Sequence, residues 1–219
     1  MIIRQKQEKP VVGFNGFAVQ ATWTKQLKDT IRKRLMLVSG RSYLSLYEGH
    51  ALRNEAFDYL SNSQLVETNF QIHDKMIFFD TNNPEQRLKM RLNYVKNMVE
   101  SDYIICCRGW GNFSFRFYET LCCGRIPIFI DTDCVLPYDF KIDWKKYCVW
   151  VERKDLPQIA EKVAEFHNKL SPQEFVELQY KCRQVWKYWL SYEGFFSNLW
   201  QHFQINNFSK IQAIPVNSG

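Results

Sequence analysis

Short segments that suit buried strands alternate along this chain with stretches of helical periodicity. The strand-like segments cover residues 11–12, 65–70, 103–107, 126–130 and 148–151. Residues 103–107 and 126–130 are apolar throughout, and each of the two segments is too short for a buried helix. Apolar strands that alternate with helices predict a parallel sheet with helices on both faces.

Helical spacing of apolar residues predicts several helices between these strands. They cover residues 23–38, 50–60, 84–99 and 114–123, and a helical region over 156–204 is interrupted near Ser171-Pro172 and Ser191. Pro84 in the first turn marks the start of the third helix. Its apolar stripe consists of Leu88, Leu92, Val95 and Val99. Gly124 follows the fourth helix at the position of a left-handed cap.

Two loops follow predicted strands of the sheet, over residues 13–16 and 108–114. Parallel α/β sheets bind ligands in the crevice beyond the carboxyl ends of their strands. These loops are therefore the expected ligand-binding positions.

The length of the chain suits one domain or one and a half. We expect a charged lead-in over 1–9, a domain over 10–205 with C-terminal helices from about 156, and a tail over 206–219.

The composition is that of an ordinary globular protein, with 46% apolar and 24% charged residues in 219. The formal net charge of +6 favours an anionic ligand without choosing among nucleotide, sulfated sugar, membrane surface and nucleic acid. Residues 32–34 contribute three basic side chains to a predicted helix, where a solvated face is the simplest explanation. The other basic residues are dispersed, so nucleic-acid binding ranks below the other functions.

The chain has seven cysteines, an odd number, and no two of them have CxxC spacing. This pattern predicts buried, reduced thiols rather than a zinc site or a disulfide framework. Reduced thiols suit a reducing compartment. No stretch is long and apolar enough to span a bilayer, and residues 1–10 lack the apolar core of a signal peptide. The sequence therefore predicts a cytoplasmic protein, with peripheral association with a membrane left open.

The segment from Arg108 to Glu119 combines features that suit a phosphate. Two glycines in the loop, Gly109 and Gly111, allow close approach of the backbone. Ser114 can cap the following helix, whose N–H groups and dipole favour an anion. Arg108 and Arg116 add guanidinium donors. Glu119, three residues after Arg116, can accept hydrogen bonds from ribose hydroxyls. The alternative is that Arg116 and Glu119 only pair with each other.

Residues 103–137 resemble the C-terminal part of exostosin-family glycosyltransferases. The matching order is an apolar strand, a loop of small residues, Arg116 and Glu119, and then Gly124, Pro127 and Leu136-Pro137. The resemblance continues more weakly over about residues 10–190, through 53–55 and 68–70 upstream and through Trp144 and 156–157 downstream. It implies a Rossmann-like domain that corresponds to the C-terminal half of a two-domain GT-B enzyme.

The resemblance also implies a nucleoside-diphosphate sugar as substrate, linked to UDP or GDP, with no other cofactor. Glu119 would bind the ribose, and Arg116 with the 108–114 loop would face the diphosphate. The implied catalytic residues are Arg108, Arg116 and Glu119. The implied donor-binding residues are Gly13, Asn15, Gly16, Arg108, Gly109, Gly111, Asn112, Ser114, Arg116 and Glu119.

The family's N-terminal half, which binds the acceptor and often supplies the catalytic base, has no counterpart in the matching region. A glycan acceptor would then require an N-terminal domain or a partner chain. No base is named for this reason. The alternative function is a catalytically silent module that binds a nucleotide sugar or a partner.

The remaining polar motifs have simpler explanations. Asp131-Thr132-Asp133 resembles a metal-binding Asp-x-Asp motif, but a loop that caps the preceding strand is favoured. His50 is expected to be exposed at the start of a helix, with a role as base as the alternative. His73 falls in an irregular loop that could border a cleft. His167 and His202 are expected to have no chemical role. The C-terminal aromatic residues have the spacing of core residues, or of a helix that crosses back to another domain.

Overall fold

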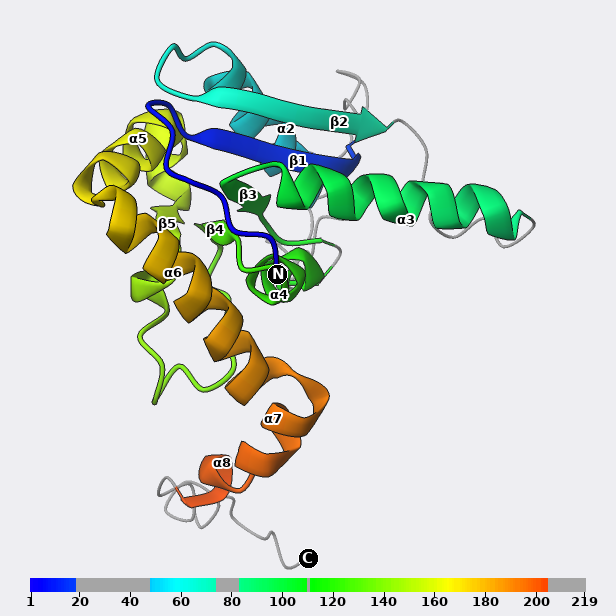
Figure 1. Cartoon of the computed structure of the whole chain (residues 1–219), viewed down its shortest axis with the longest axis vertical. Coiled ribbons are helices and arrows are strands. Elements are labelled where there is room, and N and C mark those ends of the chain that lie inside the picture. The colour runs from blue at the N-terminus through cyan, green and yellow to red at the C-terminus, as the bar shows by residue number, and fades with distance from the viewer. Residues whose placement is uncertain (19–47, 74–82, 110, 205–219) are drawn as a thin grey trace, which may run out of the picture.

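Five parallel strands form one sheet in the order β2-β1-β3-β4-β5 (Figure 1). The computed structural model describes residues 1–18, 48–73, 83–109 and 111–204. The predicted helix over 23–38, its basic run 32–34, Trp110 and the tail 206–219 lie outside the described residues. The strands are β1 (Val11–Phe17), β2 (Glu67–His73), β3 (Tyr103–Cys106), β4 (Ile126–Asp131) and β5 (Val149–Glu152). The predicted parallel sheet is confirmed.

Strand β1 is longer than the sequence predicts. Residues 13–16, predicted to be a loop, continue the strand and pair in parallel register with residues 69–72 of β2. The prediction of a loop at 13–16 is therefore wrong. The apolar pattern breaks at Gly13, but the ladder with β2 satisfies the backbone groups of these residues and extends the strand. The carboxyl end of β1 consequently lies at Phe17.

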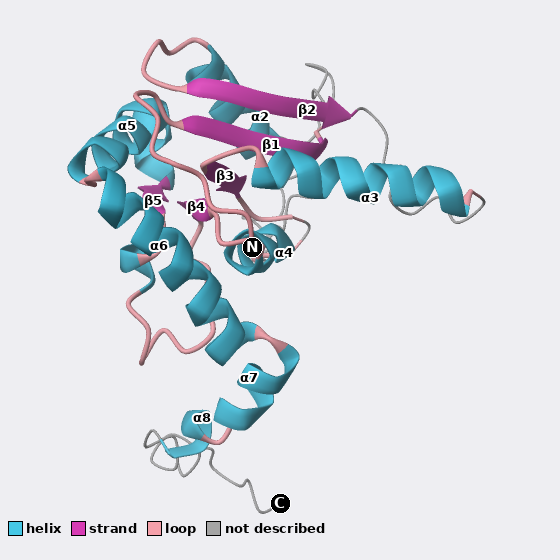
Figure 2. Cartoon of the chain, in the orientation of Figure 1, coloured by secondary structure: helices cyan, strands magenta, loops and turns pink. Residues whose placement is uncertain are grey.

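Helices cover both faces of the sheet (Figure 2). Helix α2 (Glu48–Ser61) packs with α5 (Ile159–Lys169) on one face, and α3 (Pro84–Val99), α4 (Phe115–Cys122) and α6 (Pro172–Val185) lie on the other. Helices α7 (Tyr192–Asn198) and α8 (Gln201–Gln204) follow a π-helical turn over Trp186–Leu190. Short 3-10 helices cover Trp144–Lys146 and Arg153–Gln158. The result is the predicted Rossmann-like arrangement of layers.

Helix ends follow the predicted signals. Ser171 begins α6 with a reciprocal capping box to Glu174, and the Ser191 side chain accepts a hydrogen bond from the N–H of Gly194 in α7. Gly124 has a φ of 66°, as expected for a left-handed cap after α4. These local signals are readable from sequence because each depends on residues within one helical turn.

The apolar stripe of α3 does not form a buried face. Leu88, Leu92 and Val95 are exposed, and the buried residues of the helix are Asn97 and Met98 in its last turn. Figure 1 shows that α3 runs past the ends of β1 and β2, so only its C-terminal part overlies the sheet. The periodicity identified the helix, but it did not show where along the sheet the helix lies.

The charged lead-in over residues 1–9 is an ordered segment that packs at the amino ends of the strands. Arg4 Nε donates to Asp102 Oδ1 at 2.5 Å, and the Arg4 backbone exchanges hydrogen bonds with the Gln179 side chain of α6. The backbone carbonyl of Gln7 lies 2.8 Å from Nε2 of His167. The segment therefore belongs to the domain.

Arg125 lies at the centre of these contacts. Its side chain is 0% exposed and donates to the carbonyls of Gly124, Ile2 and Val99 and to Gln179 Oε1. Burial lowers the pKa of Arg125 to about 10, so the guanidinium remains charged at neutral pH. One buried cation therefore joins the N-terminal segment to α3, α6 and the turn before β4.

All seven cysteines are free thiols, as the sequence predicts. Cys106, Cys107, Cys148 and Cys182 are buried, and the other three are half-buried. Within the described residues, we find no helix with both the length and the apolarity needed to cross a bilayer.

We predict that Asp102→Asn lowers the free energy of unfolding by about 2 kcal/mol, because it leaves the Arg4 guanidinium without its buried carboxylate. Asp102 Oδ2 also accepts the N–H of Val11, so the change weakens the start of β1 as well. Urea unfolding of both proteins measures the difference. The control is Asp155→Asn, which removes the half-exposed pair with Lys162 and should cost less than about 1 kcal/mol. Equal losses in the two variants would contradict the prediction.

Candidate functional site

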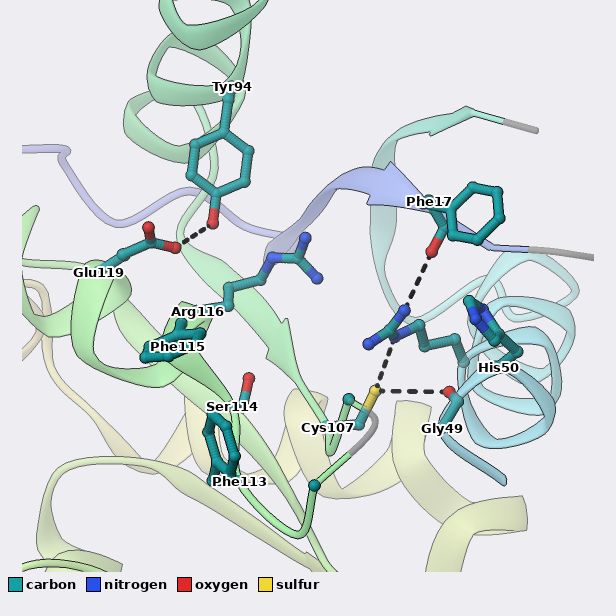
Figure 3. Close-up of a pocket in the computed structure, with 13 residues that line it drawn as sticks. Phe17, Gly49, His50, Tyr94, Cys107, Phe113, Ser114, Phe115, Arg116 and Glu119 are labelled. Atoms are coloured by element: carbon teal, nitrogen blue, oxygen red, sulfur yellow. Dashed lines mark hydrogen bonds between the residues drawn. The ribbon is translucent and has the colours of Figure 1, made fainter. Parts of the chain in front are cut away.

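A cavity of about 490 Å³ opens at the carboxyl ends of β1 and β3 (Figure 3). The order of the strands reverses between these two, which is the position where parallel α/β sheets bind ligands. Phe17, the last residue of β1, and Cys107, which follows β3, both line the cavity. The other lining residues are Gly49, His50, Arg53, Tyr94, Gly109, Gly111, Phe113, Ser114, Phe115, Arg116 and Glu119.

The loop after β3 enters α4 at the cavity wall. Ser114 occupies the N-cap position with an extended backbone, as predicted, but its side chain forms no capping hydrogen bond and lines the cavity instead. Ser114 is therefore the N-cap residue, as predicted, but the predicted hydrogen bond from its side chain to the helix is wrong. The N-terminus of α4 consequently borders the cavity, where its dipole favours negative charge.

Arg116 is held against β1. Its guanidinium carbon lies 4.0 Å from the centre of the Phe14 ring, and Nη2 donates to the Asn15 carbonyl at 2.8 Å. A Cβ on Gly16 would lie 2.6 Å from Nη2, so the missing side chain of Gly16 provides the space for this contact. The ion pairs of the described residues include none between Arg116 and Glu119. The alternative that these two side chains only pair with each other is therefore not what the structure shows.

Glu119 lies one turn further along α4 and is bonded to α3. The Tyr94 hydroxyl donates to Glu119 Oε2 at 2.5 Å. Burial raises the pKa of Tyr94 well above its usual range, although the charge of Arg116 opposes the shift. Tyr94 therefore remains a hydrogen-bond donor at any physiological pH and fixes the orientation of the carboxylate. Figure 3 shows Tyr94 and Glu119 together at one side of the cavity.

Arg53, on α2, adds a second guanidinium to the cavity wall. It donates to the carbonyls of Phe17 and Arg108 and to the Cys107 thiol, at 3.0, 3.2 and 3.4 Å. All three partners are neutral. Among the ion pairs of the described residues, neither Arg53 nor Arg116 occurs. Both guanidinium groups therefore border the cavity without an ion-pair partner among the described residues, and the Glu119 carboxylate of the same cavity is bonded to Tyr94 instead.

Several predicted binding residues support the cavity wall rather than line it. Arg108 is buried and is absent from the described lining residues, and its carbonyl accepts from Arg53. Asn112 is bonded to Thr132 and Asp133, in the turn after β4. In that turn the Asp131 carboxylate accepts the N–H of Cys134, as expected for a loop that caps the strand.

The predicted residues of β1 also lie behind the cavity wall. Gly13 packs against Ser101, and a Cβ at this glycine would lie 2.2 Å from the serine hydroxyl oxygen. Asn15 is buried and bonds Gln71 and His73 of β2 through its side chain. The predicted residues that line the cavity are Gly109, Gly111, Ser114, Arg116 and Glu119.

The histidines differ in part from expectation. His50, predicted to be exposed, is buried against Phe17 and lines the cavity, because the first turn of α2 packs on the loop after β3. His73 is the last residue of β2 and lies 3.2 Å from Asn15 Oδ1, not in an irregular loop. His167 is buried between the Tyr103 hydroxyl and the Gln7 carbonyl, and His202 packs on Tyr138.

Tyr94 and Arg53 are polar side chains of the site that sequence reasoning missed, whereas His50 was considered as a base but expected to be exposed. Arg53 falls within the region of family resemblance, which was the one available signal for it. Tyr94 carried none, and the burial of His50 was not predicted, because the place of both residues at the cavity depends on how α3 and α2 cross the sheet.

Comparison with known proteins gives a consistent set of relatives. The family model described as "Exostosin GT47 domain" matches residues 5–166. Exostosin-1 of Drosophila melanogaster is 28% identical over 135 residues, which cover 60% of this chain and 18% of that protein. The probable glucuronosyltransferase 47 A of Physcomitrium patens is 39% identical over 70 residues, covering 32% of this chain and 15% of that protein.

Another relative, the probable beta-1,4-xylosyltransferase IRX10 of Arabidopsis thaliana, is 35% identical over 66 residues, covering 30% of this chain and 16% of that protein. The matches thus span less than one fifth of the length of these relatives. Among solved structures, that of TarM aligns with a TM-score of 0.46 and 13% identity, covering 93% of this chain and 38% of TarM.

We predict that Arg116→Lys lowers the free energy of unfolding by about 1–2 kcal/mol. Lysine keeps the charge but loses both the contact of the guanidinium with the Phe14 ring and the forked donor geometry. Urea unfolding measures the effect. Arg91→Lys, on the exposed face of α3, is the matched control and should stay within about 0.5 kcal/mol of the parent protein. A loss at Arg116 no larger than at Arg91 would show that the contact with β1 contributes nothing to stability.

Proposed function

The chain belongs to the exostosin GT47 family, and from this premise we propose that its cavity binds the nucleoside-diphosphate sugar of a glycosyltransferase reaction. The observation that carries the proposal is the pair of guanidinium groups, Arg53 and Arg116, at one cavity wall with Glu119. Their hydrogen bonds go to carbonyls and a thiol, so their charges remain available to an anion. A diphosphate is an anion of suitable size and geometry for two such groups.

The shape of the cavity supports the same ligand class. Its volume of about 490 Å³ falls within the range of small-molecule sites in proteins, and it lies at the strand ends where nucleotides bind to this type of sheet. The N-terminus of α4 adds a partial positive charge between the loop and Arg116. These features favour a phosphate-bearing ligand over a neutral one.

Glu119 supplies the acceptor needed to bind ribose. Tyr94 occupies Oε2, which leaves Oε1 to accept a hydrogen bond from a hydroxyl of the ligand. A carboxylate beside a cationic wall would repel the phosphates if they lay next to it. The nucleoside therefore lies at Glu119 and the diphosphate lies between Arg116 and Arg53.

In the proposed reaction, the bond between the sugar's anomeric carbon and the diphosphate oxygen breaks while an acceptor oxygen bonds to the same carbon. The acceptor hydroxyl loses its proton to a base on the acceptor side, and the diphosphate leaves with the bonding electron pair. Arg116 and Arg53 stabilise the charge that develops on the diphosphate. A glycan is the acceptor class that the family favours, bound by a further domain or a partner chain.

We predict that Glu119→Gln weakens the binding of UDP or GDP about ten- to a hundredfold, since it removes a charged acceptor for ribose hydroxyls. Isothermal titration calorimetry of both nucleotides measures the effect. The control is Glu161→Gln, an exposed position on α5, which should leave the dissociation constant within twofold. Absence of binding by the parent protein, or equal affinities for parent and Glu119→Gln, would overturn the proposed site.

Turnover distinguishes an enzyme from a silent binding module. Incubation with a panel of sugar nucleotides, followed by measurement of released nucleoside diphosphate with and without a glycan acceptor, reports transfer and hydrolysis. Binding without release in every combination would support the silent module and contradict an active transferase in this chain alone.

A further inference from the structure

The end of the cavity opposite Glu119 contains the imidazole of His50, which has no role in the proposed binding of the nucleotide. Gly49 and His50 begin α2 and line this end together with Phe17. In Figure 3, His50 and Glu119 lie at opposite sides of the cavity, and Arg116 lies between them. A ligand that reaches from Glu119 past Arg116 therefore ends near His50.

Close backbone contact fixes His50 in this position. A Cβ on Gly49 would lie 2.5 Å from the carbonyl oxygen of Arg108 and 2.9 Å from that of Gly109. Only glycine allows α2 to approach the loop so closely. This contact holds the first turn of α2 against the loop after β3. It thereby also fixes the position of the imidazole of His50, the next residue.

One ring nitrogen of His50 is buried without a hydrogen-bond partner. The side chain is 7% exposed, its ring centre lies 5.0 Å from that of Phe17, and Nδ1 is buried with no hydrogen-bond partner. An unsatisfied buried polar atom costs about 1–3 kcal/mol. Arg53 does not fill the gap, because its donors go to Phe17, Arg108 and Cys107. Nδ1 is also closed to solvent, so a ligand hydroxyl in the cavity can supply the missing partner once the imidazole ring rotates toward it.

The surroundings of His50 favour the neutral imidazole. Burial, and after it the charge of Arg53, lowers the pKa of His50 below its ordinary value. A neutral imidazole offers one donor and one acceptor, which matches a sugar hydroxyl that can both donate and accept. It matches a phosphate poorly, because a phosphate needs donors and charge, which Arg53 and Arg116 already provide.

We propose that His50 is a positioning and specificity residue that hydrogen-bonds a hydroxyl of the transferred sugar through Nδ1. The inference rests on the proposed function and adds the place of the glycosyl group within the same cavity. The ligand then runs from ribose at Glu119, through a diphosphate between Arg116 and Arg53, to the sugar at His50.

The test compares each nucleotide with its sugar-linked form. Calorimetry gives the dissociation constants of UDP, UDP-xylose and UDP-glucuronic acid, and of GDP and GDP-mannose, for the parent protein and for His50→Leu and His50→Asn. Leucine keeps volume and removes the polar atoms, whereas the amide of asparagine lies close to the position of Nδ1. Thermal unfolding of each variant confirms that it folds.

We expect His50→Leu to weaken binding of the preferred sugar nucleotide about fivefold more than binding of the matching nucleotide. His50→Asn should restore at least part of this difference. A variant that loses affinity for both ligands by the same factor would overturn the proposal and assign His50 a packing role, and so would asparagine behaving like leucine. A parent protein that binds neither nucleotide would overturn the proposed function and this inference with it. A parent that binds nucleotide and sugar nucleotide equally, with His50→Leu unchanged in their ratio, would overturn the inference alone.

Discussion

The contact of Arg116 with β1 connects the sheet to the site, and the geometry of the cavity depends on it. The guanidinium carbon lies 4.0 Å from the centre of the Phe14 ring, and Nη2 donates to the Asn15 carbonyl in the space that Gly16 leaves. This contact fixes how α4 is oriented and where it lies relative to the carboxyl end of β1. With α4 fixed, Glu119 faces Tyr94 of α3, and the loop before the helix forms the remaining wall.

The two ends of the sheet use arginine in opposite ways. At the amino ends of the strands, Arg4 pairs with Asp102, and Arg125 donates through Nη1 and Nη2 to four oxygen acceptors that join the N-terminal segment to α3, α6 and the loop before β4. At the carboxyl ends, Arg53 and Arg116 are positioned by neutral acceptors only. The first arrangement stabilises the fold through satisfied charge. The second fixes the direction of each guanidinium through neutral acceptors and leaves it without an ion-pair partner among the described residues, which suits an anion-binding site.

Local signals in the sequence predicted most of the fold and about half of the site. The apolar runs, Pro84, Gly124 and Ser171 depend on neighbours within a few residues, and the elements they mark were correctly identified. The extension of β1 through residues 13–16 depended on pairing with β2, which is distant in sequence. Arg116 and Glu119 were identified because they share one helix with the loop. Tyr94 and Arg53 were missed, and His50 was wrongly expected to be exposed, because their helices cross the sheet from other parts of the chain and periodicity does not specify where such helices lie.

The cavity walls come from β1, α2, α3 and the loop and helix that follow β3, so no local part of the chain contains the site. A ligand can contact all of these elements only in the folded chain, where they are assembled around the cavity. The unfolded chain offers it no comparable site. Binding is then thermodynamically linked to folding: the free energy of unfolding rises by RT ln(1 + [L]/Kd) at a free ligand concentration [L]. Because α2 meets the loop through the contact at Gly49, the ligand also opposes any local opening that separates them. The concentration of the ligand would thus govern the fraction of the chain that is folded, in addition to any reaction in which the cavity takes part.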